Sequence, residues 1–198
     1  MAICKTKDGW SLSEKVENTL DKFVLDCVGI VSRFTRYVLV SGYVVILVGR
    51  SRVTEDVDML IEPMDLATFK KFHRTAEKAG FEFINPEDAT GLHEMLKDQT
   101  SIRMARVGTI IPNMEMKYAR DKPGQESLAQ RQHFLMNGKD LFTSPFELQI
   151  PYKLYLGGDK DIEDAVFLWE LLKDNLNPKD LQKYMKMMGV EGHKYGIG

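Results

Sequence analysis

The residues with the clearest capacity for chemistry are Asp56 and Asp58, which lie two positions apart in an otherwise apolar segment. Alternate side chains of an extended strand share a face, so both carboxylates would point to one side, with their Cα atoms roughly 6–7 Å apart. Mg²⁺ prefers one or two carboxylates together with phosphate oxygens, so the pair suits a metal-bound nucleoside triphosphate. Alone the pattern is weak, because any exposed strand or turn can contain it.

The segment before these aspartates strengthens the prediction. Ser41 and Gly42 separate two apolar runs, residues 37–40 and 43–48, as a turn between a strand and a helix would. Such a turn presents backbone N–H groups and a helix N-terminus to an anion. We therefore predict that Ser41 and Gly42 line bound phosphates.

The run Leu-Val-Ser-Gly-Tyr at 39–43, followed by residues 49–58 with Asp-Val-Asp at their end, resembles the nucleotidyltransferase superfamily of DNA polymerase beta type. It is most similar to the small prokaryotic group of abortive-infection E toxin-like and uncharacterised nucleotidyltransferases. That signature consists of a hydrophobic residue, Gly-Gly or Gly-Ser, a short helix, and Asp-hydrophobic-Asp/Glu. Ser41 stands at the usual first glycine, and we expect this change to keep the turn's small-residue requirement. The resemblance implies Mg²⁺ or Mn²⁺ as cofactor, with Asp56 and Asp58 as metal ligands and catalytic residues.

A third carboxylate, Glu115, is found in a predicted strand over residues 113–118, where three apolar residues alternate with Glu115 and Lys117. The superfamily commonly uses a third strand carboxylate beside the metals, as a metal ligand and as a general base that aligns or deprotonates the attacking hydroxyl. The resemblance assigns this role to Glu115. The alternative is an exposed glutamate paired with a neighbouring lysine.

A second group of charged residues follows in the C-terminal part. Lys153 matches a helical lysine of the toxin-like group, where a flexible point charge suits the β- and γ-phosphates. Asp161 and Asp164, three residues apart, share a helix face near the predicted helix start. They act either at the nucleotide site or as acidic residues that stabilise the helix dipole. Lys160 is either a second phosphate contact or a solvated lysine.

Two arginines, Arg50 and Arg52, directly precede the carboxylate strand. Either could approach the phosphates or neutralise the carboxylates, and the family pattern does not select one. The four histidines are scattered, and no pair has the spacing of a zinc site, so we assign no histidine to a metal.

Composition sets wider limits. The 198 residues are 43% hydrophobic and 28% charged, as in an ordinary globular protein, and the net charge of −2 gives no overall attraction to nucleic acid or anionic membranes. Two cysteines form no disulfide or metal framework, which favours a reducing cytoplasm. No leader pattern and no run of roughly 18–20 apolar residues is present, so we expect neither secretion nor a membrane step.

Periodicity and capping patterns predict the remaining elements. Residues 1–10 are expected to be a loose lead-in, and a capping box at Ser11 and Glu14 predicts a long helix after it. Asp65 predicts the N-cap of a helix over 66–79 that ends at Gly80. The other expectations are strands at 81–84 and 101–106, a loop with one helical turn at 85–100, a helix near 126–136, and C-terminal helices beginning near 151, 160 and 178.

These elements predict an α/β (α+β) fold, with a small mixed β-sheet flanked by helices and followed by a C-terminal helical bundle. We expect a nucleotidyltransferase core with its N-terminal helix at residues 1–144, a packed helical region at 145–190 and a disordered tail at 191–198.

The resemblance implies transfer of an NMP group from a nucleoside triphosphate, ATP or GTP, to an acceptor hydroxyl. The acceptor could belong to RNA, to a protein or to a small molecule, and a toxin-like enzyme would have an antitoxin-like partner. The near-neutral charge disfavours tRNA as acceptor. The alternative is a module that keeps the fold and binds nucleotide or a partner without turnover, against which the three carboxylates argue.

Overall fold

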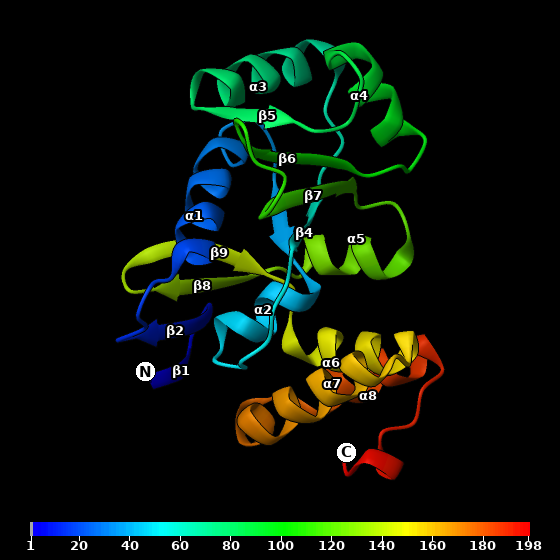
Figure 1. The fold of residues 1–198 in the computed structure, drawn as a ribbon. Coiled ribbons are helices and arrows are strands. Elements are labelled where there is room, and N and C mark those ends of the chain that lie inside the picture. The colour runs from blue at the N-terminus through cyan, green and yellow to red at the C-terminus, as the bar shows by residue number, and fades with distance from the viewer. Residues whose placement is uncertain (1) are drawn as a thin grey trace.

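A computed structural model describes residues 2–198, which form one mixed sheet with helices on both faces and at both ends (Figure 1). The sheet has nine strands in the order β1-β2-β8-β9-β3-β4-β7-β6-β5. The pairs β2–β8, β3–β9 and β4–β7 are parallel, and the other neighbours are antiparallel. The strands are β1 (Ala2–Thr6), β2 (Gly9–Ser13), β3 (Tyr37–Leu39), β4 (Asp56–Ile61), β5 (Phe81–Phe83), β6 (Ile102–Arg106), β7 (Asn113–Tyr118), β8 (Gln132–Met136) and β9 (Lys139–Thr143).

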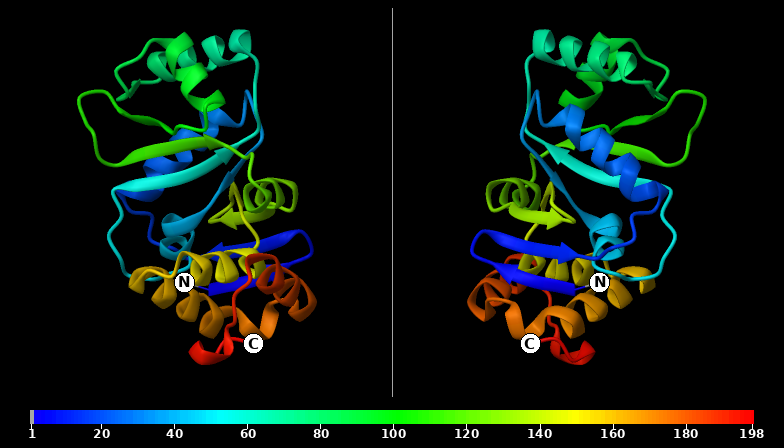
Figure 2. Two further views of the ribbon diagram at one scale, coloured as in Figure 1. Left: turned by 90° about the vertical axis from the view of Figure 1, so that its right-hand side faces the viewer. Right: turned by 90° about the vertical axis from the view of Figure 1, so that its left-hand side faces the viewer.

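The helices divide into groups by position. Helices α3 and α4 lie beside β5 and β6 at one end of the molecule, and α6, α7 and α8 pack together at the other end (Figures 1 and 2). The helices are α1 (Thr19–Val31), α2 (Ser41–Leu47), α3 (Leu66–Lys78), α4 (Ala89–Lys97), α5 (Lys122–Ala129), α6 (Phe146–Leu156), α7 (Asp159–Leu172) and α8 (Pro178–Met188), with 3-10 turns η1 (Lys173–Asn175) and η2 (His193–Tyr195). The predicted fold class is confirmed, although the sheet is larger than expected.

The two faces of β4 have different surroundings because side chains alternate along a strand. Val57, Met59 and Ile61 are buried in the main core, together with apolar residues of α1 and α3. The opposite face carries Asp56, Asp58 and Leu60, and only Leu60 packs there, in a small cluster beneath α5. The alternation thus buries the apolar set and leaves both aspartates on the less crowded face.

Several local predictions are confirmed. The Asp65 side chain accepts a hydrogen bond from the Thr68 amide at the start of α3, and Gly80 follows that helix with φ of +81°. The helix expected to begin near residue 178 is α8: Asn177 caps it, Pro178 occupies its first turn, and Gly189 ends it in the left-handed conformation. Each signal acts within a few residues of chain, so sequence alone could locate it.

The N-terminal prediction was wrong. Residues 2–13 form the hairpin β1–β2 instead of a loose lead-in, and β2 continues into the sheet by pairing with β8. The capping box belongs to Asn18 and Asp21, not to Ser11 and Glu14, so the helix begins at Thr19. Ser11 is in β2, whose backbone donors and acceptors pair with other strands.

Two central predictions were also wrong. Residues 85–100 contain the nine-residue helix α4, capped by Asp88, and not a loop with one turn. The helix expected near 126–136 is divided: α5 ends at Ala129, and the remainder forms strand β8 of the β8–β9 hairpin. Pairing of β8 with β2 and β9 supplies backbone partners that a local pattern cannot indicate.

The C-terminal helices follow the predicted order, but α6 begins at Phe146, five residues before the expected start at Pro151, which lies inside it. Gly157, with φ of +71°, ends α6 in the left-handed conformation. The last residues are ordered against the expectation of a disordered tail: η2 forms, and Ile197 is 2% exposed within the main core. The domain division at residue 144 stays a prediction.

Candidate active site

The predicted strand–turn–helix is present as β3, the turn at Val40 and Ser41, and α2. Ser41 has φ of +62°, a left-handed conformation that glycine adopts freely and other residues adopt with strain. Its position therefore demands a backbone conformation as well as a small side chain. The Ser41 amide donates to Gln149 Oε1 at 3.0 Å, so α6 already supplies a partner to this turn.

Because Gly42 has no side chain, the side chain of Arg52 can approach its Cα closely. A Cβ added at Gly42 would lie 3.3 Å from Arg52 Nη2. The missing side chain thus lets the Arg52 guanidinium lie against the start of α2, where we had predicted phosphate contacts from both residues.

Strand register brings the predicted carboxylates together. In the parallel pair β4–β7, Asp58 is opposite Glu115 and Asp56 is opposite Asn113, so all four side chains belong to one face. Burial raises the pKa of the Asp58 carboxyl, and the charges of Glu115 and then Asp56 raise it further, against a hydrogen bond with the Ser41 side chain. This arrangement places the negative charges of Glu115 and Asp56 beside Asp58.

Glu115 also has cationic partners. Its carboxylate lies 2.8 Å from Arg103 Nη2 and 3.2 Å from Lys117 Nζ. Burial by itself would raise the pKa of Glu115, but hydrogen bonds from Arg103 and Lys117 outweigh it and lower that pKa below its usual value. Glu115 is thus paired with Lys117, as in the alternative that we gave for this residue. Its role as a general base stays a prediction.

The side chains fit a hard cation in type. Asn113 Nδ2 donates to Asp56 Oδ1 at 3.0 Å, whereas the buried Asn113 Oδ1 has no hydrogen-bond partner within residues 2–198. Carboxylate and amide oxygens are the ligands that Mg²⁺ accepts, and it takes one or two carboxylates with substrate oxygens completing its shell. In the part of the chain described, no three acidic, histidine or cysteine side chains are grouped as metal ligands. The carboxylates of Asp56 and Asp58 match this preference in type, and metal binding by them stays a prediction.

A cavity of about 400 Å³ opens beside these carboxylates, between the sheet face, α5 and α6. Ser41, Asp58 and Glu115 line one part of it, and Tyr152 from α6 lines another. This volume lies within the usual range of small-molecule sites. The other predicted residues, including Asp56, lie outside its lining.

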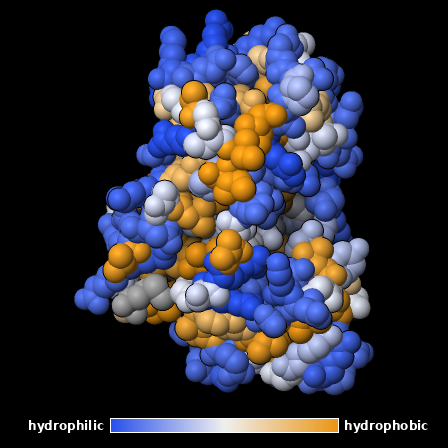
Figure 3. Space-filling model, viewed as in Figure 1, coloured by the Kyte–Doolittle hydropathy of each residue, from blue (hydrophilic) through white to orange (hydrophobic). Residues whose placement is uncertain are grey.

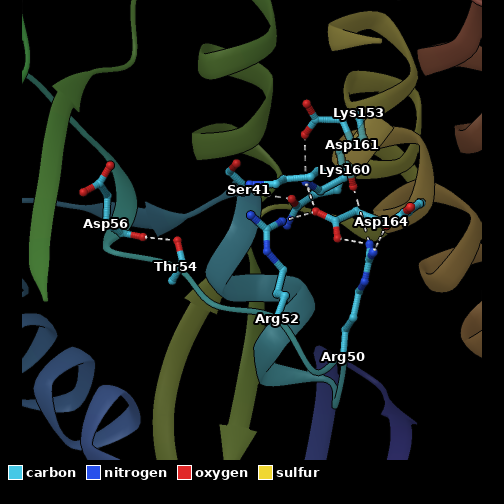
Figure 4. Close-up of polar contacts among 11 residues, drawn as sticks. Ser41, Arg50, Arg52, Thr54, Asp56, Lys153, Lys160, Asp161 and Asp164 are labelled. Carbon is cyan, nitrogen blue, oxygen red and sulfur yellow. Dashed lines mark hydrogen bonds and ion pairs between the residues drawn. The ribbon is translucent and has the colours of Figure 1, made fainter. Parts of the chain in front are cut away.

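The predicted basic and acidic C-terminal residues form a second cluster, shown in Figure 4. Lys153 Nζ lies 2.7 Å from Asp164 Oδ2 and 3.4 Å from Asp161 Oδ1. Arg50 and Arg52, from the loop after α2, both form ion pairs with Asp164. We call these five residues the Asp164 cluster; it joins the α2–β4 loop to α6 and α7.

The charged side chains in and beside this cluster differ in how deeply they are buried. The Asp164 side chain is 0% exposed and that of Lys153 is 1% exposed, and Asp164 is the shared partner of three cations. Asp161, in the first turn of α7, is partly exposed. Lys160 is exposed, and its carbonyl accepts from Arg50 Nη1 at 3.5 Å.

The structure thus brings the predicted residues into two adjoining groups, the carboxylates on the sheet and the Asp164 cluster. In Figure 4, Ser41 lies beside the Asp164 cluster while the Asp56 side chain points away from it. Two residues at the site were missed, Gln149 and Arg103. Strand alternation could have placed Arg103 beside Glu115, but no local signal marked Gln149.

Hydrophobic side chains gather at the surface near the β6–β7 loop (Figure 3). Val107, Ile110 and Ile111 are 61%, 68% and 48% exposed, and this loop leads directly into Asn113 beside Asp56. The edge of the carboxylate face is therefore apolar.

Comparison with solved structures identifies the fold. The solution structure of the antibiotic-resistance factor ANT(2'')-Ia aligns with a TM-score of 0.55 at 11% identity, over 91% of this chain and 95% of that one. The crystal structure of ANT(2'')-Ia with adenylyl-2''-tobramycin gives 0.53 at 14% identity, over 90% and 98%. An antigenic nucleotidyltransferase-like protein from Paracoccidioides brasiliensis gives 0.52 at 18% identity, over 87% of each chain.

The chain therefore has a nucleotidyltransferase fold, as the sequence resemblance implied. No protein-family model matches the sequence, and no curated protein matches it. None of the helices within residues 2–198 is long and apolar enough to cross a membrane.

Proposed function

We propose that this protein is a Mg²⁺-dependent nucleotidyltransferase, with Mn²⁺ as a substitute, that moves an NMP group from a nucleoside triphosphate to an acceptor hydroxyl. The observation that carries the proposal is the shared face of Asp56, Asp58 and Glu115 beside the Ser41–Gly42 turn and the cavity. The nucleotidyltransferase fold of the solved structures supports it.

Asp56 and Asp58 would hold the metal, which supplies positive charge to the phosphate oxygens and to the leaving group. The acceptor oxygen attacks the α-phosphorus, the bond to the oxygen bridging the β-phosphate breaks, and pyrophosphate leaves. Glu115 takes the hydroxyl proton as general base. To do so, its carboxylate must exchange contacts with Arg103 or Lys117.

The Asp164 cluster would serve the phosphates. Lys153 would offset charge on the leaving pyrophosphate once its buried Nζ exchanges its contact with Asp161 or Asp164, while Arg50 and Arg52 keep the α2–β4 loop against α7. Asp164 and Asp161 orient the lysine, since each lies within ion-pair distance of its Nζ. Of the two turn residues, Ser41 lines the cavity where the phosphates would bind, and its amide is held by Gln149.

For the acceptor, we place a protein or a small hydroxylated molecule ahead of RNA. The net charge of −2 gives no general attraction to a polyanion, and the surface next to Asp56 at the β6–β7 loop is apolar. Adenylyl-2''-tobramycin, the small-molecule adduct bound to ANT(2'')-Ia, gives a precedent on this fold. A toxin-like role with an antitoxin-like partner rests on the sequence resemblance.

The test has two parts. Mg²⁺ with each of the four NTPs is titrated into wild type and Asp58→Asn, and we expect binding to weaken in the variant; equal binding would remove Asp58 from the centre. Labelled NTPs are then incubated with lysate and each protein. Label on a protein, RNA or metabolite with wild type alone supports transfer, whereas binding without any labelled product supports the alternative of a nucleotide-binding module.

A further inference from the structure

One buried side chain at the cavity has a polar atom without a partner. Gln149, on α6, is 4% exposed and lines the cavity next to Ser41. Its Oε1 accepts the Ser41 amide, but its Nε2 has no hydrogen-bond partner within residues 2–198. A buried donor left unsatisfied costs about 1–3 kcal/mol, so native proteins keep few of them.

The orientation of this amide is fixed by the Ser41 backbone. If the Gln149 amide were reversed, its NH₂ group would face the Ser41 N–H, and two donors would oppose each other. Because Oε1 must therefore point to Ser41, the unpartnered end of Gln149 is its NH₂ group, which offers only N–H donors. A ligand atom that meets Nε2 must be an acceptor.

The neighbours of Gln149 indicate which ligand carries that acceptor. Ser41 is also hydrogen-bonded to Asp58, so Gln149 is one residue removed from the proposed metal-binding carboxylates. Lys117 and Arg120 add positive charge to the cavity lining, and Tyr152 adds an aromatic ring. A nucleotide supplies both matching parts, since it has anionic oxygens and a flat base.

We propose that Gln149 binds the nucleoside triphosphate through Nε2, which donates to an acceptor oxygen of the bound nucleotide. This inference rests on the proposed function. Gln149 occupies the Ser41 amide, the donor that we had expected to meet a phosphate, and offers its own N–H groups in that place. The acceptor is an oxygen of the triphosphate or a carbonyl oxygen of the base.

Two substitutions separate this role from a structural one. Gln149→Glu keeps an oxygen for the Ser41 amide and removes the donors, whereas Gln149→Met removes both. Gln125→Glu, on the exposed face of α5, adds the same charge outside the cavity lining. Thermal melts report folding, and calorimetry measures the Kd values of Mg²⁺ with ATP, Mg²⁺ with GTP and tripolyphosphate for every variant.

We expect both Gln149 variants to bind a nucleotide at least roughly tenfold more weakly than wild type, the loss of one hydrogen bond to a charged or carbonyl oxygen. Gln125→Glu should bind as wild type does. Equal weakening for tripolyphosphate and both nucleotides assigns the oxygen to the phosphates, and weakening for GTP alone assigns it to the base, since adenine has no carbonyl.

Unchanged Kd values in folded Gln149→Glu overturn the inference and leave the proposed function intact. If Gln149→Met does not fold, Gln149→Glu decides, because it keeps the contact with Ser41. Wild type that binds none of the four NTPs in the titration described above overturns the proposed function and this inference together.

Discussion

Lys153 Nζ lies 2.7 Å from Asp164 Oδ2, and neither side chain is exposed beyond 1%. An ion pair taken so far out of water is stable only when further partners satisfy it, and here Arg50 and Arg52 supply them from a loop more than 100 residues away in sequence. The same four residues therefore tie the C-terminal helices α6 and α7 to the loop after α2.

Removal of Asp164 should damage the fold more than removal of Lys153. Asp164→Ala leaves three cations without their shared partner, and we expect a loss of about 3–5 kcal/mol in the free energy of unfolding. Lys153→Met leaves Asp164 with both arginines and should cost less. Urea denaturation measures both, with the exposed Lys160→Met as control. A larger loss for Lys153→Met than for Asp164→Ala would contradict this ranking.

Strain at Ser41 gives a second prediction. With φ of +62°, Ser41→Gly should be more stable than Ser41→Ala by about 1–2 kcal/mol, because both lose the hydroxyl and only glycine relieves the left-handed backbone. Chemical denaturation of the two variants side by side isolates the backbone contribution from the lost hydrogen bond with Asp58. Equal stability would show that the turn relaxes around alanine.

The raised pKa of Asp58 predicts that the stability of the folded protein depends on pH. Its pKa is raised in the folded state, so its ionisation favours the unfolded chain. This penalty is absent below the unfolded pKa of about 4 and grows as pH rises through the folded value. Asp58→Asn should match wild type near pH 3 and exceed its Tm at pH 7, by about 2–4 °C for each kcal/mol.

Bound Mg²⁺ and NTP should reverse the order of the two Tm values, so that wild type melts above Asp58→Asn. Added Mg²⁺ with NTP should raise the Tm of wild type and leave Asp58→Asn nearly unchanged, because binding to the folded state stabilises it. Differential scanning fluorimetry with and without chelator measures the shift. An equal rise in both proteins would exclude Asp58 as a ligand.

Glu115 should separate binding from turnover. Glu115→Gln keeps the shape of the side chain and removes the proton acceptor, so NTP binding should persist while transfer falls by a factor of about 10²–10⁴. Equilibrium binding and transfer of labelled NMP measure the two separately. Lys117→Met serves as the matched control for Glu115→Gln, because it removes one ion-pair partner of Glu115 and keeps the carboxylate. Unchanged transfer in Glu115→Gln would reject the general-base role.

The sequence by itself determined the features that depend on near neighbours. Alternation placed Asp56 and Asp58 on one face of β4, two apolar runs around Ser41 and Gly42 predicted β3 and α2, and Asp65 located α3. Each rests on strand alternation, a small-residue turn or a helix cap, whose partners lie within a few residues.

Tertiary structure decided what depends on distant partners. The hairpin β1–β2 joins the sheet through β8, from Gly9 opposite His133 to Leu12 opposite Met136, so neither segment could be assigned from its own residues. The bond between Ser41 and Gln149 and the shared burial of Asp164 likewise join residues more than 100 positions apart. Such contacts depend on where the folded chain brings two segments together, and this leaves no periodic signal in either one.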